Sequence, residues 1–166
     1  MDLFSASERF MQMDDKAWRR HANPWSVWTR IPIGPLLILA IFARTWIGWW
    51  CLIPILALLG WTWLNPRFFK APEKLDSWAS RGVMGERRLL SRRNSPIPDH
   101  HLKAAYITTA ISIAGIPFVL YGLTVLNGWA TAFGTALVVL GKLWFVDRMA
   151  WLHDEAGTEN RTGPTS

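Results

Sequence analysis

Cysteine is nearly absent from the sequence. Cys51 is the single cysteine among 166 residues. One thiol can form neither an internal disulfide nor a site with several thiolate ligands, which excludes disulfide-stapled secreted folds and zinc fingers. Because Cys51 lies inside a long apolar run, we expect it to be an inert packing residue.

Charged residues are also scarce, at 18% of the chain, whereas an ordinary soluble domain carries about 25%. Basic residues outnumber acidic ones, since 18 Lys and Arg against 12 Asp and Glu give a formal net charge of +6. A basic excess attracts either nucleic acid or an anionic membrane surface. The positions of the charges decide between these two partners.

The common phosphate-binding and metal-hydrolase motifs are missing. The sequence contains neither a GxxxxGK[ST] nor a GxGxxG loop, and it contains no HExxH or Glu-x-x-His pair. No motif therefore dictates a reaction, and the sequence predicts architecture better than activity.

Long apolar runs are abundant instead. Residues 46–64 form 19 positions without a charge, which as a helix would span about 28 Å, close to a bilayer core. Residues 104–126 form a second uncharged run. Residues 129–152 form a third apolar run, with Lys142 inside it and Asp147-Arg148 near its end. Residues 31–43 are apolar too, and this run reaches a membrane-spanning length only if residues 25–30 are included.

Short polar breaks separate these runs in pairs. Arg44-Thr45 divides the first two, and Asn127-Gly128, a strong turn signal, divides the last two. We therefore predict an all-α integral membrane protein with four transmembrane helices in two hairpins plus amphipathic interfacial helices. We expect an N-terminal amphipathic segment (residues 1–24), followed by hairpin 1 (25–64). A basic loop with an interfacial helix near residues 75–90 comes next (65–103). Hairpin 2 (104–152) and a disordered tail (153–166) complete the chain.

Basic residues concentrate outside the apolar runs. The middle segment 65–103 holds nine, at positions 67, 70, 74, 81, 87, 88, 92, 93 and 103, and residues 1–30 hold five, at 9, 16, 19, 20 and 30. The positive-inside rule then predicts a multi-pass protein of the cytoplasmic (inner) membrane with both termini in the cytoplasm. Topology explains the basic excess, so we expect no nucleic acid partner.

Tryptophan agrees with this topology. The chain has 12 tryptophans, and most of them fall where the expected helices meet a membrane interface. An aromatic belt at both interfaces is typical of membrane proteins, and it explains these rings without a cofactor.

The cytoplasmic side gathers residues that could contact anionic lipid headgroups or a protein partner. Cations beside aromatic rings suit phosphate groups, although a solvated basic face on an anionic leaflet explains the same pattern. The candidates are Arg19, Arg20, His21, Asn23, Arg30, Trp78, Arg81, Glu86, Arg87 and Arg88.

The histidines also lie on the expected cytoplasmic side, some with acidic neighbours. Imidazole and carboxylate together bind zinc or iron, so the start of the third helix and the end of the fourth could converge on a metal. The alternative is that these histidines only hydrogen-bond headgroups or backbone. The candidate ligands are His21, Asp99, His100, His101 and His153.

Lys142 is an intramembrane charge, and such charges are costly and often functional. Asp147, five residues further on, is a candidate partner of Lys142 or of Arg148, and the alternative is that the lysine extends its stem to the interface. A small transporter gated around Lys142 and Pro117 is one reading of this position.

Two blocks, RHANPWSVWTR at 20–30 and WTWLNPRFF…WASRGVMGERRLL at 61–90, together with the later DHH, carry a family resemblance. The chain resembles an uncharacterised family of small bacterial and archaeal membrane proteins over roughly residues 18–151. This resemblance implies a helical membrane protein and supplies no activity, so no catalytic residue is carried over.

The leading interpretation is a non-enzymatic accessory or scaffold protein whose cytoplasmic aromatic-basic face contacts lipid, a membrane protein partner or a second copy of the chain. No cofactor is required by this interpretation. The main alternative is a cytoplasmic-face metal-binding or enzymatic site built from the histidine set.

Overall fold

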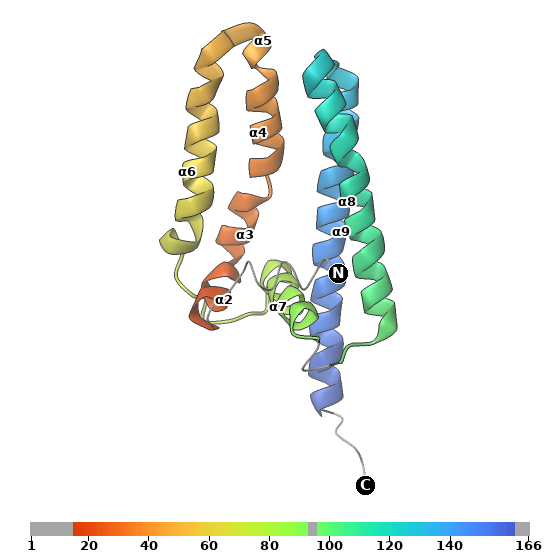
Figure 1. The fold of residues 1–166 in the computed structure, drawn as a ribbon. Coiled ribbons are helices and arrows are strands. Elements are labelled where there is room, and N and C mark those ends of the chain that lie inside the picture. Colours follow the sequence, from red (N-terminus) through yellow and green to blue (C-terminus); the bar gives the residue numbers. More distant parts are fainter. Residues whose placement is uncertain (1–14, 93–95, 162–166) are drawn as a thin grey trace.

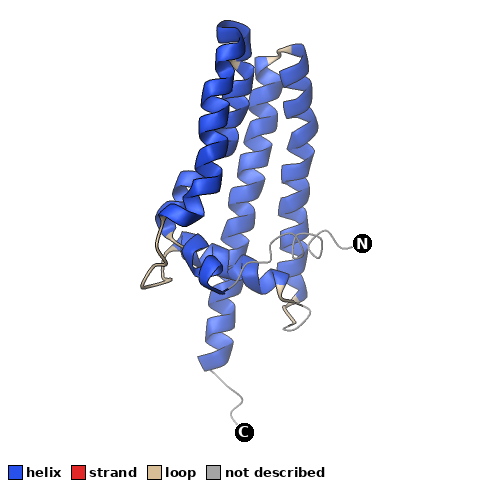
Figure 2. Cartoon of the chain, turned by 60° about the vertical axis from the view of Figure 1, so that its left-hand side comes forward, coloured by secondary structure: helices blue, strands red, loops and turns tan. Residues whose placement is uncertain are grey.

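The computed structural model describes residues 15–92 and 96–161, and within these ranges the chain forms helices and no strand (Figures 1 and 2). The prediction of an all-helical protein is therefore confirmed for the described part of the chain. The expected N-terminal amphipathic segment falls largely on residues 1–14, which lie outside the described residues.

The first half of the chain forms two antiparallel arms joined by a sharp turn (Figure 1). Asn23 begins the second helix of the ascending arm, because its side-chain oxygen accepts hydrogen bonds from the backbone N–H groups of Trp25 (2.9 Å) and Ser26 (3.4 Å). Gly48 has a φ of +53°, which a glycine adopts without strain, and it lies in the turn. The elements are α2 (Asp15–His21), α3 (Pro24–Arg30), α4 (Ile33–Phe42), α5 (Arg44–Ile47), η1 (Gly48–Cys51) and the descending α6 (Leu52–Phe68).

The second half forms a closely packed antiparallel pair, α8 (Asp99–Val125) and α9 (Gly128–Arg161). The turn between them uses Leu126 in the left-handed region, and Asn127 then accepts a hydrogen bond from the N–H of Ala130 at 2.9 Å. Small residues let the two backbones approach each other, because a Cβ would meet the facing helix at each of four glycines. These are Gly115, Gly122, Gly134 and Gly141.

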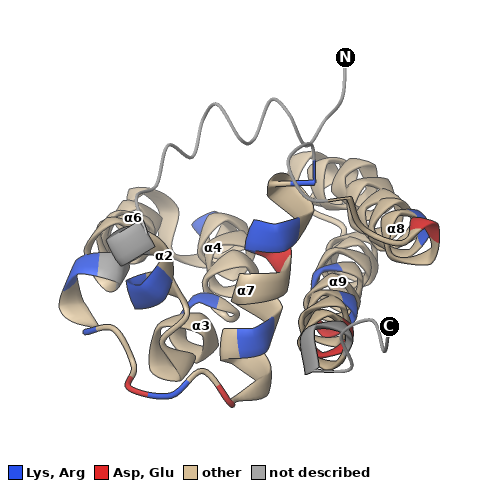
Figure 3. Ribbon diagram, turned by 90° about the horizontal axis from the view of Figure 1, so that it is seen from below, with Lys and Arg blue, Asp and Glu red and all other residues tan. Residues whose placement is uncertain are grey.

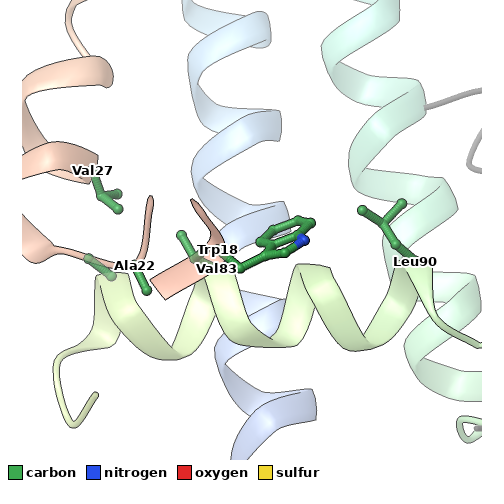
Figure 4. Close-up of a cluster of buried hydrophobic side chains, with 6 residues drawn as sticks. Trp18, Ala22, Val27, Val83 and Leu90 are labelled. Carbon is green, nitrogen blue, oxygen red and sulfur yellow. The ribbon is translucent and has the colours of Figure 1, made fainter. Parts of the chain in front are cut away.

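Helix α7 (Trp78–Leu90) lies across one end of both halves (Figure 1). Ser77 begins it by accepting a hydrogen bond from the N–H of Ser80 at 3.1 Å. One face of α7 packs on α2 and α3 in a cluster of buried apolar side chains (Figure 4), namely Trp18, Ala22, Val27, Ala79, Val83 and Leu90. The other packs on the α8–α9 pair through Leu89, Ile97, Ala105, Phe145, Met149 and Leu152.

Three stretches are long and apolar enough to cross a membrane: Pro24–Asn65, Asp99–Val125 and Gly128–Thr158. Only 11%, 22% and 22% of their most apolar windows are buried within the protein. Apolar side chains therefore face outward along most of their length, which indicates a membrane protein.

Two expected boundaries differ in the structure. The helix of the basic loop begins at Trp78 rather than near Leu75, because Ser77 caps it. Helix α9 continues to Arg161, so residues 153–161, expected within a disordered tail, are helical. Ala156 is buried there, and it extends the packed surface of α9 beyond Leu152.

Candidate functional site

A cavity of about 440 Å³ opens between the ascending arm (α2 to α4) and α9, with α7 beneath it. Its walls are mainly apolar and include Ile31, Pro35, Val138, Val139 and Leu143. Its volume lies within the range of small-molecule sites. Seen from the α7 end, α7 carries basic and acidic residues and lies between the first arms and α9 (Figure 3).

Charged and polar side chains line the same cavity. Arg30 donates hydrogen bonds from Nε to the carbonyl oxygen of Ser26 and from Nη2 to that of His21, both at 3.0 Å. These two bonds fix its guanidinium beside α2. Lys142 and Glu86 form an ion pair, with 3.6 Å between Nζ and Oε1. The cavity thus contains two cationic groups and one carboxylate.

His21 adds a neutral imidazole to this set. Burial and, to a smaller extent, the nearby Arg30 lower the pKa of His21 to about 4, although Glu86 partly opposes the shift. The ring is therefore uncharged at neutral pH. Its Nδ1 is buried and has no hydrogen-bond partner among the described residues. With His21 neutral, the cavity keeps one surplus positive charge, which favours an anionic group.

Several candidates for lipid or partner binding make contacts that hold the chain together. Asn23 caps α3, and its Nδ2 donates to the carbonyl oxygen of Lys70 at 2.9 Å. Trp78 stacks on Trp28 with 5.6 Å between ring centroids, and its indole N–H donates to Asp147 at 3.2 Å. These contacts give Asn23 and Trp78 a structural role.

The remaining members of that set are distributed over the α7 end. Arg81 pairs with Asp154 at 2.8 Å, so it links α7 to α9. Arg19 is exposed on α2, and Arg20, Arg87 and Arg88 are half-buried. Of the ten candidates, the structure brings together His21, Arg30 and Glu86 at the cavity.

Of the two candidate partners of Asp147, the structure pairs it with Arg148, and Lys142 has a partner that the sequence analysis did not identify. It pairs with Glu86 of α7, while Asp147 is paired with Arg148 at 2.9 Å. Asp147 also accepts the Trp78 hydrogen bond, so its carboxylate has two other partners.

The histidine candidates separate into two places. His100 and His101 at the start of α8 meet Glu155 of α9, whose Oε2 lies 3.4 Å and 2.9 Å from their respective Nε2 atoms. His21 lines the cavity instead. Among the described residues, the one group of three such side chains with converging ligand atoms is His100, His101 and Glu155, and it includes neither Asp99 nor His153.

Glu155 is a site residue that the sequence analysis did not identify. The antiparallel pairing of the last two helices predicts that the end of α9 lies beside the start of α8. Because the helix was expected to end at residue 152, Glu155 fell in the tail. A helical continuation through Ala156 is the signal that would have found it.

These features define a class: a helical membrane protein whose two halves enclose a cavity with apolar walls and a net positive charge. The chain belongs to the family of unknown function DUF6653, whose sequence profile matches residues 6–166. The resemblance to an uncharacterised family is thus confirmed. In the same comparisons, no curated protein and no solved structure matched the chain.

Proposed function

We propose that the protein crosses the cytoplasmic membrane four times, with both termini and α7 on the cytoplasmic side. Pro24–Phe42, as α3 and α4, is long enough to span about 28 Å, and α6 returns over a similar length. Exposed tryptophans support this arrangement, since Trp46, Trp49 and Trp129 are 71%, 85% and 88% exposed near the ends opposite α7.

Cysteine labelling tests this topology. In a Cys51→Ala background, we expect Thr45→Cys and Lys74→Cys to react with a membrane-impermeant maleimide from opposite sides, because Thr45 lies at the α5 turn and Lys74 precedes α7. Both native side chains are exposed, so both positions should be reachable. Labelling of both from the same side of sealed vesicles would contradict the four-span topology.

Within this topology, we propose a non-enzymatic accessory protein that binds one anionic lipid in the cavity. The observation that carries the proposal is the cavity itself, which joins apolar walls to a set of charges with one positive surplus. An acyl chain would lie along Val138 and Val139, and the headgroup phosphate would lie near Arg30 and Lys142. Burial of the chain supplies the apolar contribution and charge selects the headgroup.

The Lys142 side chain is 59% exposed, so the charged part of the cavity is reachable from outside. Glu86 limits the preference, because it already neutralises one cation. We therefore expect the cavity to prefer an anionic phospholipid over a zwitterionic one. We do not expect it to prefer a strongly anionic polymer.

A glycine pair provides a matched test. Gly34 lines the cavity, whereas Gly60 on α6 does not, and a Cβ at either position meets no heavy atom within 4 Å. We expect Gly34→Leu to fill part of the cavity and to lower the affinity for phosphatidylglycerol by about 10-fold, equal to about 1.4 kcal/mol. Gly60→Leu should leave the affinity unchanged. Native mass spectrometry of the detergent-solubilised protein measures both.

Headgroup selectivity is measured in the same experiment. Wild-type protein should retain phosphatidylglycerol in preference to phosphatidylcholine, and Lys142→Met should reduce that preference. Equal retention of the two lipids by the wild type would contradict the role of charge. Equal effects of the two glycine substitutions would contradict binding in the cavity.

A further inference from the structure

The cluster of His100, His101 and Glu155 lies where the start of α8 meets the end of α9, and it shares no residue with the cavity. Each of the three side chains offers one ligand atom, and these atoms all lie within 4.8 Å of one another. Two imidazole nitrogens and a carboxylate oxygen are a ligand set typical of zinc and of other divalent transition metals. We propose that these residues bind a divalent transition-metal ion, with zinc as the preferred one.

Two of the three spacings between the ligand atoms are close to those around such an ion, and the third, between the two histidines, is within 4.8 Å. Bonds of about 2.0–2.2 Å in a tetrahedral zinc site place neighbouring ligand atoms about 3.3 Å apart. The distance from Glu155 Oε2 to His100 Nε2 is 3.4 Å, and that to His101 Nε2 is 2.9 Å. The first already matches, and the second needs to widen by only a few tenths of an ångström.

A simple hydrogen bond accounts for only part of this arrangement. Both Nε2 atoms approach the same oxygen of Glu155, and a bond of good length forms only with His101. His101 is completely buried, so its ring is held in place, with its Nε2 at the carboxylate. A single cation between the three atoms would satisfy both imidazoles and the carboxylate at once.

The neighbouring side chains hold the cluster in place and leave it open to an ion from solvent. Trp151 packs against both histidine rings, with centroid distances of 5.6 Å to His100 and 5.2 Å to His101. The His100 side chain is 51% exposed and that of Glu155 is 31% exposed, so an ion can enter from solvent. Three protein ligands leave a fourth position for water, which is the arrangement of open zinc sites.

Metal analysis tests the proposal. Full-length protein with an affinity tag that lacks histidine is purified in mild detergent, stripped with a chelator and dialysed against Zn²⁺ or Co²⁺. We expect one bound ion per chain by plasma mass spectrometry. His100→Ala and Glu155→Gln should each weaken binding by at least about 100-fold, since each removes a direct ligand. Both replaced side chains are partly exposed, so these variants should fold.

His153→Ala is the matched control, because His153 lies two residues from Glu155 on the same helix but outside the cluster. It should bind the ion as the wild type does. The visible absorption of bound Co²⁺ should appear in the wild type and in His153→Ala and disappear in both ligand variants. Absence of stoichiometric binding by the wild type, or equal binding by the ligand variants, would overturn the site.

Discussion

Replacing Gly85 by alanine is expected to destabilise the protein by about 3–5 kcal/mol, because α7 would no longer fit against α9. A Cβ at Gly85 would overlap the backbone carbonyl of Met149. Backbone cannot rotate aside as a side chain can, so the helices must separate. Their separation would expose Leu89 and Met149, which are completely buried in the native contact.

Two other glycines make this expectation specific. Gly60→Ala, on α6 with open space around it, should be neutral or stabilising by up to about 1 kcal/mol. Gly82→Ala should cost less than Gly85→Ala, because the atom nearest its Cβ belongs to the side chain of Val146. Denaturant unfolding in detergent, followed by far-UV circular dichroism, measures all three. A Gly85→Ala protein as stable as the wild type would contradict the close α7–α9 contact.

The glycines of α7 show a limit of what can be predicted from the sequence. From the sequence, Gly82 and Gly85 predict a weakened or bent interfacial helix, since glycine is a poor helix former. In the structure they lie inside a regular helix, at the points where it approaches α9. Local propensity carries no information on a contact between residues more than sixty positions apart. The long apolar helices could be predicted because the length and the lack of charge of an apolar run are local properties of the sequence.

The candidate site, too, could be predicted from the sequence only in part. That His100 and His101 would lie beside the end of the last helix followed from antiparallel pairing. Glu86 as the partner of Lys142 did not follow from pairing, because it depends on how α7 crosses the molecule. From the sequence, Asp147 was a candidate partner because it lies only five residues from Lys142.

Helix α7 therefore links the two halves. Ser80 donates a hydrogen bond of 2.7 Å to the carbonyl oxygen of Ala22, while Arg81 pairs with Asp154 of α9. Glu86 on the same helix contributes to the cavity. Any change that displaces α7 should thus impair lipid binding together with stability, which is why the cavity test uses Gly34 and not an α7 residue.

The second large effect is expected at Asn65, which is completely buried where α6 meets α3. Its Oδ1 accepts a hydrogen bond from Ser26 Oγ at 2.6 Å, and its Nδ2 donates one to Thr29 Oγ1 at 2.7 Å. Asn65→Ala would leave the buried Ser26 hydroxyl without this partner and would open a small cavity. We expect a loss of about 2–4 kcal/mol in the free energy of unfolding.

A double-mutant cycle separates the hydrogen bond from the cavity. Ser26→Ala in the Asn65→Ala background removes the orphaned hydroxyl, so its cost should be smaller than in the wild type by about 1 kcal/mol. Thr62→Ala is the control on α6, because Thr62 is exposed and, within the described part of the chain, its hydroxyl donates to the carbonyl oxygen of Leu58 in its own helix. Its effect should stay within about 0.5 kcal/mol. Strictly additive costs for Ser26 and Asn65 would show that the hydrogen bond between these two side chains contributes nothing to stability.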